Sequence, residues 1–140
     1  MNKTILTAIV AALSLLAAGQ TMAEPARDAI LADLLLQAKA ADSGFGGFAA
    51  ERGKNLFLSS PASGKPDTPS CTTCHTPSPQ GIGKTRAGKE IKPMAVSVNS
   101  ARYTDPAEVE KWFGRNCNSV LGRDCTATEK GDFITFMAGQ

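Results

Sequence analysis

The sequence "CTTCH", residues 71–75, determines what kind of fold this chain needs. It places two thiols three positions apart and follows them directly with the only histidine in the chain. Thiols at this spacing can add to the two vinyl groups of haem, after which the adjacent imidazole can reach the iron. The motif therefore predicts one haem c, attached covalently through Cys71 and Cys74, with His75 as an iron ligand.

Three other chemistries would fit parts of this motif. A structural zinc ion needs four ligands, and with a single histidine it would have to draw on distant cysteines. A thioredoxin-like redox pair needs βαβ surroundings, for which the sequence shows no pattern. A plain disulfide between Cys71 and Cys74 is the remaining alternative. In an exported chain of this size the haem interpretation is favoured.

The chain begins with the pattern of a secretory signal peptide. Lys3 precedes an apolar run from Ile5 to Ala18, and a stretch of small residues ends at Ala23. The apolar run is shorter than the roughly 20 residues of a membrane-spanning helix, although a retained N-terminal anchor is the alternative. We therefore predict cleavage after Ala23 and a periplasmic location, where cysteines can be oxidised.

The mature chain has the composition of one ordinary domain. Removing 23 of the 140 residues leaves 117, which is enough for a modest core. The loss of Lys3 leaves 14 basic and 13 acidic residues. A net charge this close to zero gives no indication of nucleic acid as a partner.

Helical patterns are short and are separated by long loops. Apolar residues recur at helical spacing over 26–40, and a second helical pattern follows the breaker "SGFGG". Gly53 lies inside this second pattern and costs about 1 kcal/mol relative to alanine. Its presence there suggests that another backbone passes close by.

Two later helices carry their own start signals. Asp105 can cap a helix that has Pro106 at its first position, and this helix is predicted to end near Gly114. Thr126 and Glu129 form the capping pattern of a last helix that runs almost to the C-terminus.

The loops 59–70 and 76–93 are rich in proline and glycine. Against the single acid Glu90, the second loop holds four basic residues: Lys84, Arg86, Lys89 and Lys92. A solvated loop is the simplest interpretation, and docking to an acidic partner or contact with carboxylates is the alternative.

Together these elements favour a mostly α, single-domain class I cytochrome c fold wrapped around one haem. Short helices and long loops offer too little apolar surface to close on themselves, and a buried porphyrin supplies a large shared face. The helix that holds Gly53 and the last helix are expected to cross beside it. The predicted organisation is a signal peptide at 1–23, an N-terminal helical extension at 24–41 and the monohaem cytochrome c domain at 42–140.

The residues alone leave the sixth iron ligand open. Because His75 is the only histidine, a second histidine ligand from this chain is excluded. Met137 fits the apolar face of the last helix, where methionine ordinarily packs in the core. Met94 lies in a loop that could fold over the iron, and thioether ligation is common in electron-transfer cytochromes. Spacing alone therefore makes Met94 the first choice.

Three stretches resemble the sphaeroides haem protein family of cytochromes c. They are "GKPDTPSCTTCHT", "KTRAGKEIKPMA" and "RYTDPAEVEKWFGRNCNSVLGRDCTATEKGD", and the resemblance runs from about Asp42 to the C-terminus. It implies haem attachment at the cysteines of "CTTCH" and proximal ligation by its histidine. It also implies that the sixth ligand is the asparagine just before the first cysteine of a disulfide pair. Carried over by position, these residues are Cys71, Cys74, His75, Asn116 and the pair Cys117 and Cys125.

Asn116 also has a plainer interpretation, as a residue at the C-terminal end of a helix beside a bridge that only staples a small secreted domain. The family commonly has another apolar residue where this chain has Met94, so the chain offers a rival ligand. Trp112 and Phe113 are predicted to pack in the core, with contact of one of them to haem as the alternative. Arg115 could meet either a bound ligand or a haem propionate.

Two details of the iron's surroundings are predicted as well. The second ring nitrogen of His75 should donate to a backbone carbonyl, for which Pro93 is a candidate. Gly114 and Gly122 could give the segment around Asn116 room to move.

The resemblance implies electron transfer coupled to the binding of a diatomic ligand. An amide oxygen is a hard donor that suits ferric iron better than ferrous iron, so reduction should weaken the bond to Asn116. Oxygen, nitric oxide or carbon monoxide could then bind. The implied electron donors are a dihaem cytochrome c and, behind it, a membrane cytochrome b.

Two other functions stay open. One is an ordinary electron carrier with His75 and Met94 as iron ligands, inert to gases. The other is an enzyme, an oxygen or nitric-oxide reductase or oxygenase, although the sequence shows no second histidine and only scattered carboxylates as acid–base groups.

Overall fold

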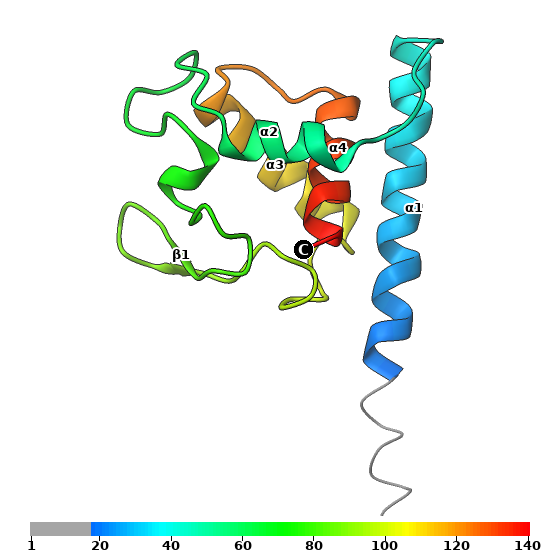
Figure 1. Cartoon of the computed structure of the whole chain (residues 1–140), viewed down its shortest axis with the longest axis horizontal. Coiled ribbons are helices and arrows are strands. Elements are labelled where there is room, and N and C mark those ends of the chain that lie inside the picture. Colours follow the sequence, from blue (N-terminus) through cyan, green and yellow to red (C-terminus); the bar gives the residue numbers. More distant parts are fainter. Residues whose placement is uncertain (1–17) are drawn as a thin grey trace, which may run out of the picture.

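The computed structural model describes residues 18–140, so most of the predicted signal peptide lies outside the described residues. The elements follow in the order α1 (Ala18–Ala41), α2 (Ala50–Leu58), the 3-10 turn η1 (Cys71–Thr73), β1 (Gly83–Lys84), β2 (Glu90–Ile91), α3 (Pro106–Val120) and α4 (Ala127–Ala138). Figure 1 shows α1 standing along one side of the molecule and the loops around η1 and β1 on the opposite side. The prediction of a mostly helical chain is confirmed.

The predicted helix over 26–40 is part of α1, which begins earlier and runs through Pro25 and the predicted cleavage point after Ala23. Its buried side chains Ile30 and Leu34 pack in one cluster with Val109 of α3 and Ile134 of α4. The segment predicted as an extension therefore contributes to the shared core. None of the described helices is both long and apolar enough to cross a membrane.

Helices α2 and α4 cross at Gly53, as the sequence predicts. A Cβ atom at Gly53 would lie 2.1 Å from the carbonyl oxygen of Asp132, so only glycine fits at this crossing. The Asp132 carboxylate is 3% exposed. It accepts from the Arg52 Nε at 2.6 Å and from the Ala49 N–H at 2.7 Å, which ties the start of α2 to α4.

Helix α3 begins where the sequence predicts and ends later. The Asp105 carboxylate accepts from the N–H groups of Ala107 and Glu108 at 2.9 and 3.2 Å. The predicted end near Gly114 is wrong, because α3 continues to Val120. Cys117 and Val120 are buried and continue the apolar face of the helix, and no atom would crowd a Cβ at Gly114.

The start of α4 has the predicted reciprocal cap. The Glu129 N–H donates to the Thr126 hydroxyl at 3.1 Å, and the Thr126 N–H donates to the Glu129 carboxylate at 2.8 Å. Phe133, Ile134 and Met137 are buried as expected. The loops 59–70 and 76–93 are confirmed as loops, apart from η1 between them and the two-residue strands β1 and β2, which pair antiparallel.

Candidate haem site

The motif at residues 71–75 folds as a tight turn. Ser70 is buried before η1, and its hydroxyl lies 2.8 Å from that of Thr72. The Cys71 carbonyl accepts from the N–H groups of Cys74 at 3.3 Å and His75 at 3.0 Å. This turn gathers both thiols and the imidazole into one short segment, and both thiols are unbonded. The alternative of a Cys71–Cys74 disulfide is therefore not what the structure has.

The β1–β2 hairpin packs against the backbone of this turn. The Lys84 N–H donates to the Cys74 carbonyl at 2.8 Å. A Cβ at Gly83 would lie 2.4 Å from that same oxygen, so the close approach requires glycine. The hairpin thereby holds the backbone of the motif in place.

Burial shifts the acid–base equilibria of the motif. The pKa of His75 is lowered to about 4, first by burial and then by the positive charge of Arg102. Burial raises the pKa of the Cys71 thiol to about 11. At neutral pH the imidazole is therefore uncharged, with a lone pair available to iron, and the Cys71 thiol is protonated.

This donor set fits haem c and does not fit zinc. Two free thiols and a neutral imidazole stand together at the attachment spacing. Within residues 18–140 no group of three or more histidine, cysteine or acidic side chains converges as a metal site would require.

Met94 is part of the core. Its side chain is 8% exposed and packs in a cluster with Phe57 and Met137, against which Cys71 also lies. Its N–H donates to the Pro79 carbonyl at 2.8 Å, and its carbonyl accepts from the Tyr103 hydroxyl at 3.2 Å. Packing therefore explains the burial of the Met94 side chain without any bond to iron. Because Cys71 packs against the same cluster, Met94 nevertheless lies near the predicted haem attachment point.

Two arginines that the sequence did not single out hold the segment around Met94. Arg102 donates to the carbonyls of Pro93 at 3.0 Å and Lys92 at 2.6 Å. Arg27 of α1 is only 6% exposed and donates to the carbonyls of Ser100 at 2.9 Å and Arg102 at 3.2 Å. The Pro93 carbonyl that was a candidate acceptor for His75 thus accepts from Arg102 in this structure. Bonds to backbone carbonyls follow no sequence pattern, so sequence reasoning missed both arginines.

Asn116 lies inside α3, four residues before its last residue, rather than in a loop. Its side chain is exposed, as are those of Trp112 and Arg115. Phe113 instead packs edge-on against Phe133 in the core, with ring centroids 5.4 Å apart. The core role predicted for both aromatic residues is therefore right for Phe113 and wrong for Trp112.

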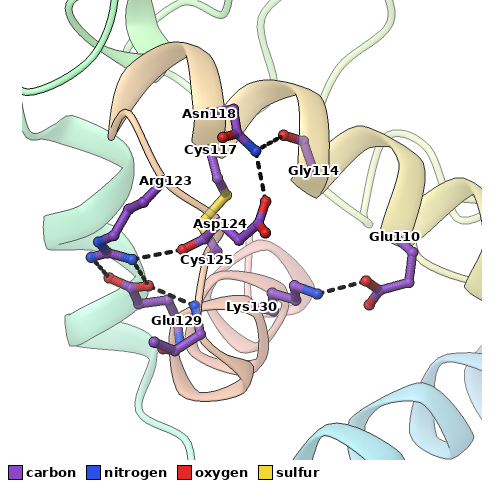
Figure 2. The surroundings of a disulfide bond; sticks show 10 residues. Glu110, Gly114, Cys117, Asn118, Arg123, Asp124, Cys125, Glu129 and Lys130 are labelled. Atoms are coloured by element: carbon purple, nitrogen blue, oxygen red, sulfur yellow. Dashed lines mark hydrogen bonds and ion pairs between the residues drawn. A yellow bond between two sulfur atoms is a disulfide. The ribbon is translucent and has the colours of Figure 1, made fainter.

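Cys117 and Cys125 form a disulfide, with their Cα atoms 5.6 Å apart, that joins α3 to the residue before the cap of α4. Figure 2 shows the polar contacts around it. The Asn118 amide donates to the Gly114 carbonyl at 2.8 Å and to the Asp124 carboxylate at 2.6 Å. The backbone after Asn116 is therefore fixed by one covalent bond and by hydrogen bonds on both sides. Asn118 was also missed, since a surface asparagine is common in any helix end.

Gly122 does not provide the freedom of movement that the sequence suggested. It has φ +70°, and a Cβ there would lie 2.4 Å from the Ser63 carbonyl oxygen. The Lys65 N–H also donates to the Ser119 carbonyl at 2.7 Å. The loop before η1 is therefore docked on the C-terminal end of α3, which connects the two parts of the predicted site.

Comparison with known proteins relates this chain to c-type cytochromes. A family described as a domain of unknown function, DUF1924, matches residues 43–137. The chain is 60% identical to the cytochrome c-type protein SHP of Cereibacter sphaeroides over 91 residues, covering 65% of this chain and 70% of SHP. It is 46% identical to cytochrome c'' of Methylophilus methylotrophus over 68 residues, covering 48% of this chain and 47% of that protein.

Solved structures agree with these relatives. A structure described as oxidised SHP, an oxygen-binding cytochrome c, superposes with a TM-score of 0.75 at 50% identity, covering 81% of this chain and 96% of that one. Oxidised cytochrome c'' of Methylophilus methylotrophus superposes with a TM-score of 0.69 at 31% identity, covering 83% of this chain and 95% of that one.

Proposed function

The chain belongs to the DUF1924 family and to the SHP-like cytochromes c, carrying one covalently bound haem c, and from this premise we propose that it is a periplasmic electron-transfer protein with a redox-gated gas-binding site. Asn116 is the iron ligand that closes the site in the oxidised protein and leaves when the iron is reduced. The observation that carries the proposal is the contrast between two side chains: Asn116 presents an uncovered amide on α3, whereas Met94 is packed in the core.

Bound haem c supplies one-electron chemistry and an iron whose sixth position can take a small gas. Cys71 and Cys74 would tether it as thioethers, and the neutral imidazole of His75 would supply a nitrogen ligand to the iron. The hydrogen bond from the Lys84 N–H to the Cys74 carbonyl holds the backbone on this side of the site. We therefore assign the movement that opens the sixth position to the part of the site that contains Asn116.

Asn116 changes its affinity because its amide oxygen is a hard, neutral donor. Such an oxygen bonds ferric iron better than ferrous iron, so reduction favours its release. Since α3 is helical through Asn116 and is pinned by the disulfide at Cys117, the movement is a rotation of the side chain rather than a swing of a loop. The amide stays close and can rebind on oxidation.

The relatives support this assignment. SHP is described as an oxygen-binding cytochrome c. A solution structure of cytochrome c'' that superposes with a TM-score of 0.69 at 32% identity, covering 81% of this chain and 93% of that one, is described as giving insight into haem-ligand detachment. Both properties match a sixth ligand that exchanges with a gas.

The proposed electron donors are a dihaem cytochrome c and, behind it, a membrane cytochrome b. The exposed Lys84, Lys89 and Lys92 on and beside the hairpin offer positive charge to an acidic donor, while Arg86 is paired with Asp67. Export by the predicted signal peptide would place the protein in the periplasm with such donors.

A second candidate is an ordinary electron carrier with Met94 as sixth ligand. It is favoured by the packing of Cys71 against the cluster that contains Met94. In that case a soft thioether would hold the iron in both oxidation states, and gases would not bind.

Carbon monoxide distinguishes the two candidates. The visible spectrum of the purified holoprotein is recorded oxidised and reduced, before and after carbon monoxide is added. The gated site predicts that only the reduced protein changes spectrum with the gas. A reduced protein that ignores carbon monoxide supports the carrier with Met94 as ligand.

A further inference from the structure

Trp112 is exposed and yet is held in one orientation. Its side chain is 45% exposed, and its indole N–H donates to the Glu108 carboxylate at 2.8 Å. The Arg115 guanidinium lies over its ring, with Cζ 5.6 Å from the ring centroid. Lys111 also lies over the ring at 5.2 Å and donates to Glu108 at 2.7 Å. These contacts offset the conformational entropy lost in fixing a large surface side chain and keep the ring against α3.

The position of Trp112 on α3 relates it to the proposed sixth ligand. Side chains four residues apart lie on the same face of a helix, one turn above the other, so Trp112 and Asn116 share a face. Val109 and Phe113 border this face on its buried side and pack into the core. The indole is thus a large side chain next to the Asn116 amide along the exposed face of the helix.

We propose that Trp112 is a wall of the sixth-ligand site and limits the size of the molecule that can replace Asn116. This inference rests on the proposed function, since it concerns the ligand that enters when Asn116 leaves. A flat ring with two rotatable bonds excludes bulk at little further entropic cost once it is held in place. Glu108 and Arg115 act as positioning residues, through the hydrogen bond to the indole and the cation–π contact.

Alkyl isocyanides of two sizes test the wall. The affinities of the reduced holoprotein for carbon monoxide, methyl isocyanide and tert-butyl isocyanide are measured by titration. We expect Trp112→Ala to raise the affinity for tert-butyl isocyanide relative to methyl isocyanide by about tenfold or more, since one methylene in a fitted pocket is worth roughly 10- to 200-fold. Trp112→Phe keeps most of the bulk and should give a smaller change.

A matched control is Leu36→Ala, which removes an exposed apolar side chain from α1, and it should leave the ratio unchanged. An unchanged ratio in Trp112→Ala overturns the inference. If the wild-type protein binds carbon monoxide and the ratio is unchanged in Trp112→Ala, only the inference fails and the proposed function stands. A reduced wild-type protein that binds none of the three ligands overturns both.

A second measurement needs no variant. Because the chain has one tryptophan, its indole N–H gives one NMR signal in a ¹⁵N-labelled sample. We expect this signal to shift when carbon monoxide binds the reduced holoprotein, while the backbone amide of Leu36 stays in place. An indole signal that does not move while the Asn116 side-chain amide does would contradict a wall at Trp112.

Discussion

Cys71 and Cys74 lie three positions apart in a 3-10 turn and are unbonded, whereas Cys117 and Cys125 lie eight positions apart and are bonded. The second pair joins the last turns of α3 to the cap of α4, with the Cα separation of an ordinary disulfide. The first pair stands beside the only histidine, on a turn held by the hairpin. The difference lies in the backbone around each pair: the first pair stays unbonded and available for the proposed haem attachment, and the second fixes the helix that carries Asn116.

The largest effect is expected from removing the first pair. Cys71→Ala combined with Cys74→Ala should abolish covalent haem attachment, since no other unbonded thiol exists within the described residues. Haem staining after denaturing electrophoresis checks this. The control is Cys117→Ala with Cys125→Ala, which should keep its stain, and loss of covalent haem in the control would remove the distinction between the pairs.

The second pair is expected to affect stability. Cys117→Ala with Cys125→Ala should lower the free energy of unfolding by about 2 to 3 kcal/mol by the loop-closure estimate for so short a loop. Denaturant unfolding of the holoprotein measures the change. A variant as stable as the wild type would mean that the hydrogen bonds of Asn118 suffice to hold the loop.

Alanine substitutions at two glycines near the second pair should change the stability of the protein in opposite directions. Gly122→Ala should destabilise by about 1 to 3 kcal/mol, because Gly122 has φ +70° and touches the Ser63 carbonyl. Gly114→Ala should stabilise by about 0.5 to 1 kcal/mol, because Gly114 lies inside α3 with open space around it. Thermal unfolding compares the two variants, and a destabilised Gly114→Ala would mean that α3 is not helical there.

The smallest effect concerns the cap that follows Cys125. The hydrogen bond from the Arg123 guanidinium is the main reason that the pKa of Glu129 lies below its ordinary value of about 4.3, and hydrogen bonds from Thr126 lower it further. A carboxyl group whose pKa is lower in the folded state stabilises the protein above its unfolded pKa, and this stability is lost as the pH falls through the folded pKa. Glu129→Gln should therefore cost about 0.5 to 1 kcal/mol at pH 7 and much less near pH 3. Unfolding curves at both pH values measure this, and an equal cost at both would exclude the charge as the cause.

Residue types with strong local preferences made much of this molecule predictable. The caps at Asp105 and Thr126 and the crossing at Gly53 follow from local chemistry, and each lies where the sequence indicated. The end of α3 was misjudged because glycine is a weak helix former, while burial of Cys117 and Val120 outweighs that preference.

The surroundings of the proposed iron ligands were less predictable. Arg27 and Arg102 act through backbone carbonyls, and which carbonyls come within reach depends on the whole fold. Trp112 was expected in the core as an apolar residue, but it lies exposed on the face of α3 that carries Asn116 and donates to Glu108. Asn116 itself was predicted from the resemblance, since spacing alone favours Met94.

The central claim is that Asn116, and not Met94, is the redox-sensitive iron ligand. The most direct measurement is the optical spectrum of the holoprotein, oxidised and reduced, with and without nitric oxide, for the wild type, Asn116→Ala and Met94→Leu. We expect a low-spin ferric spectrum that becomes high-spin on reduction and shifts with nitric oxide, with the ferric ligation lost only in Asn116→Ala. A reduced protein that stays low-spin, ignores nitric oxide and loses its sixth ligand in Met94→Leu would contradict the account.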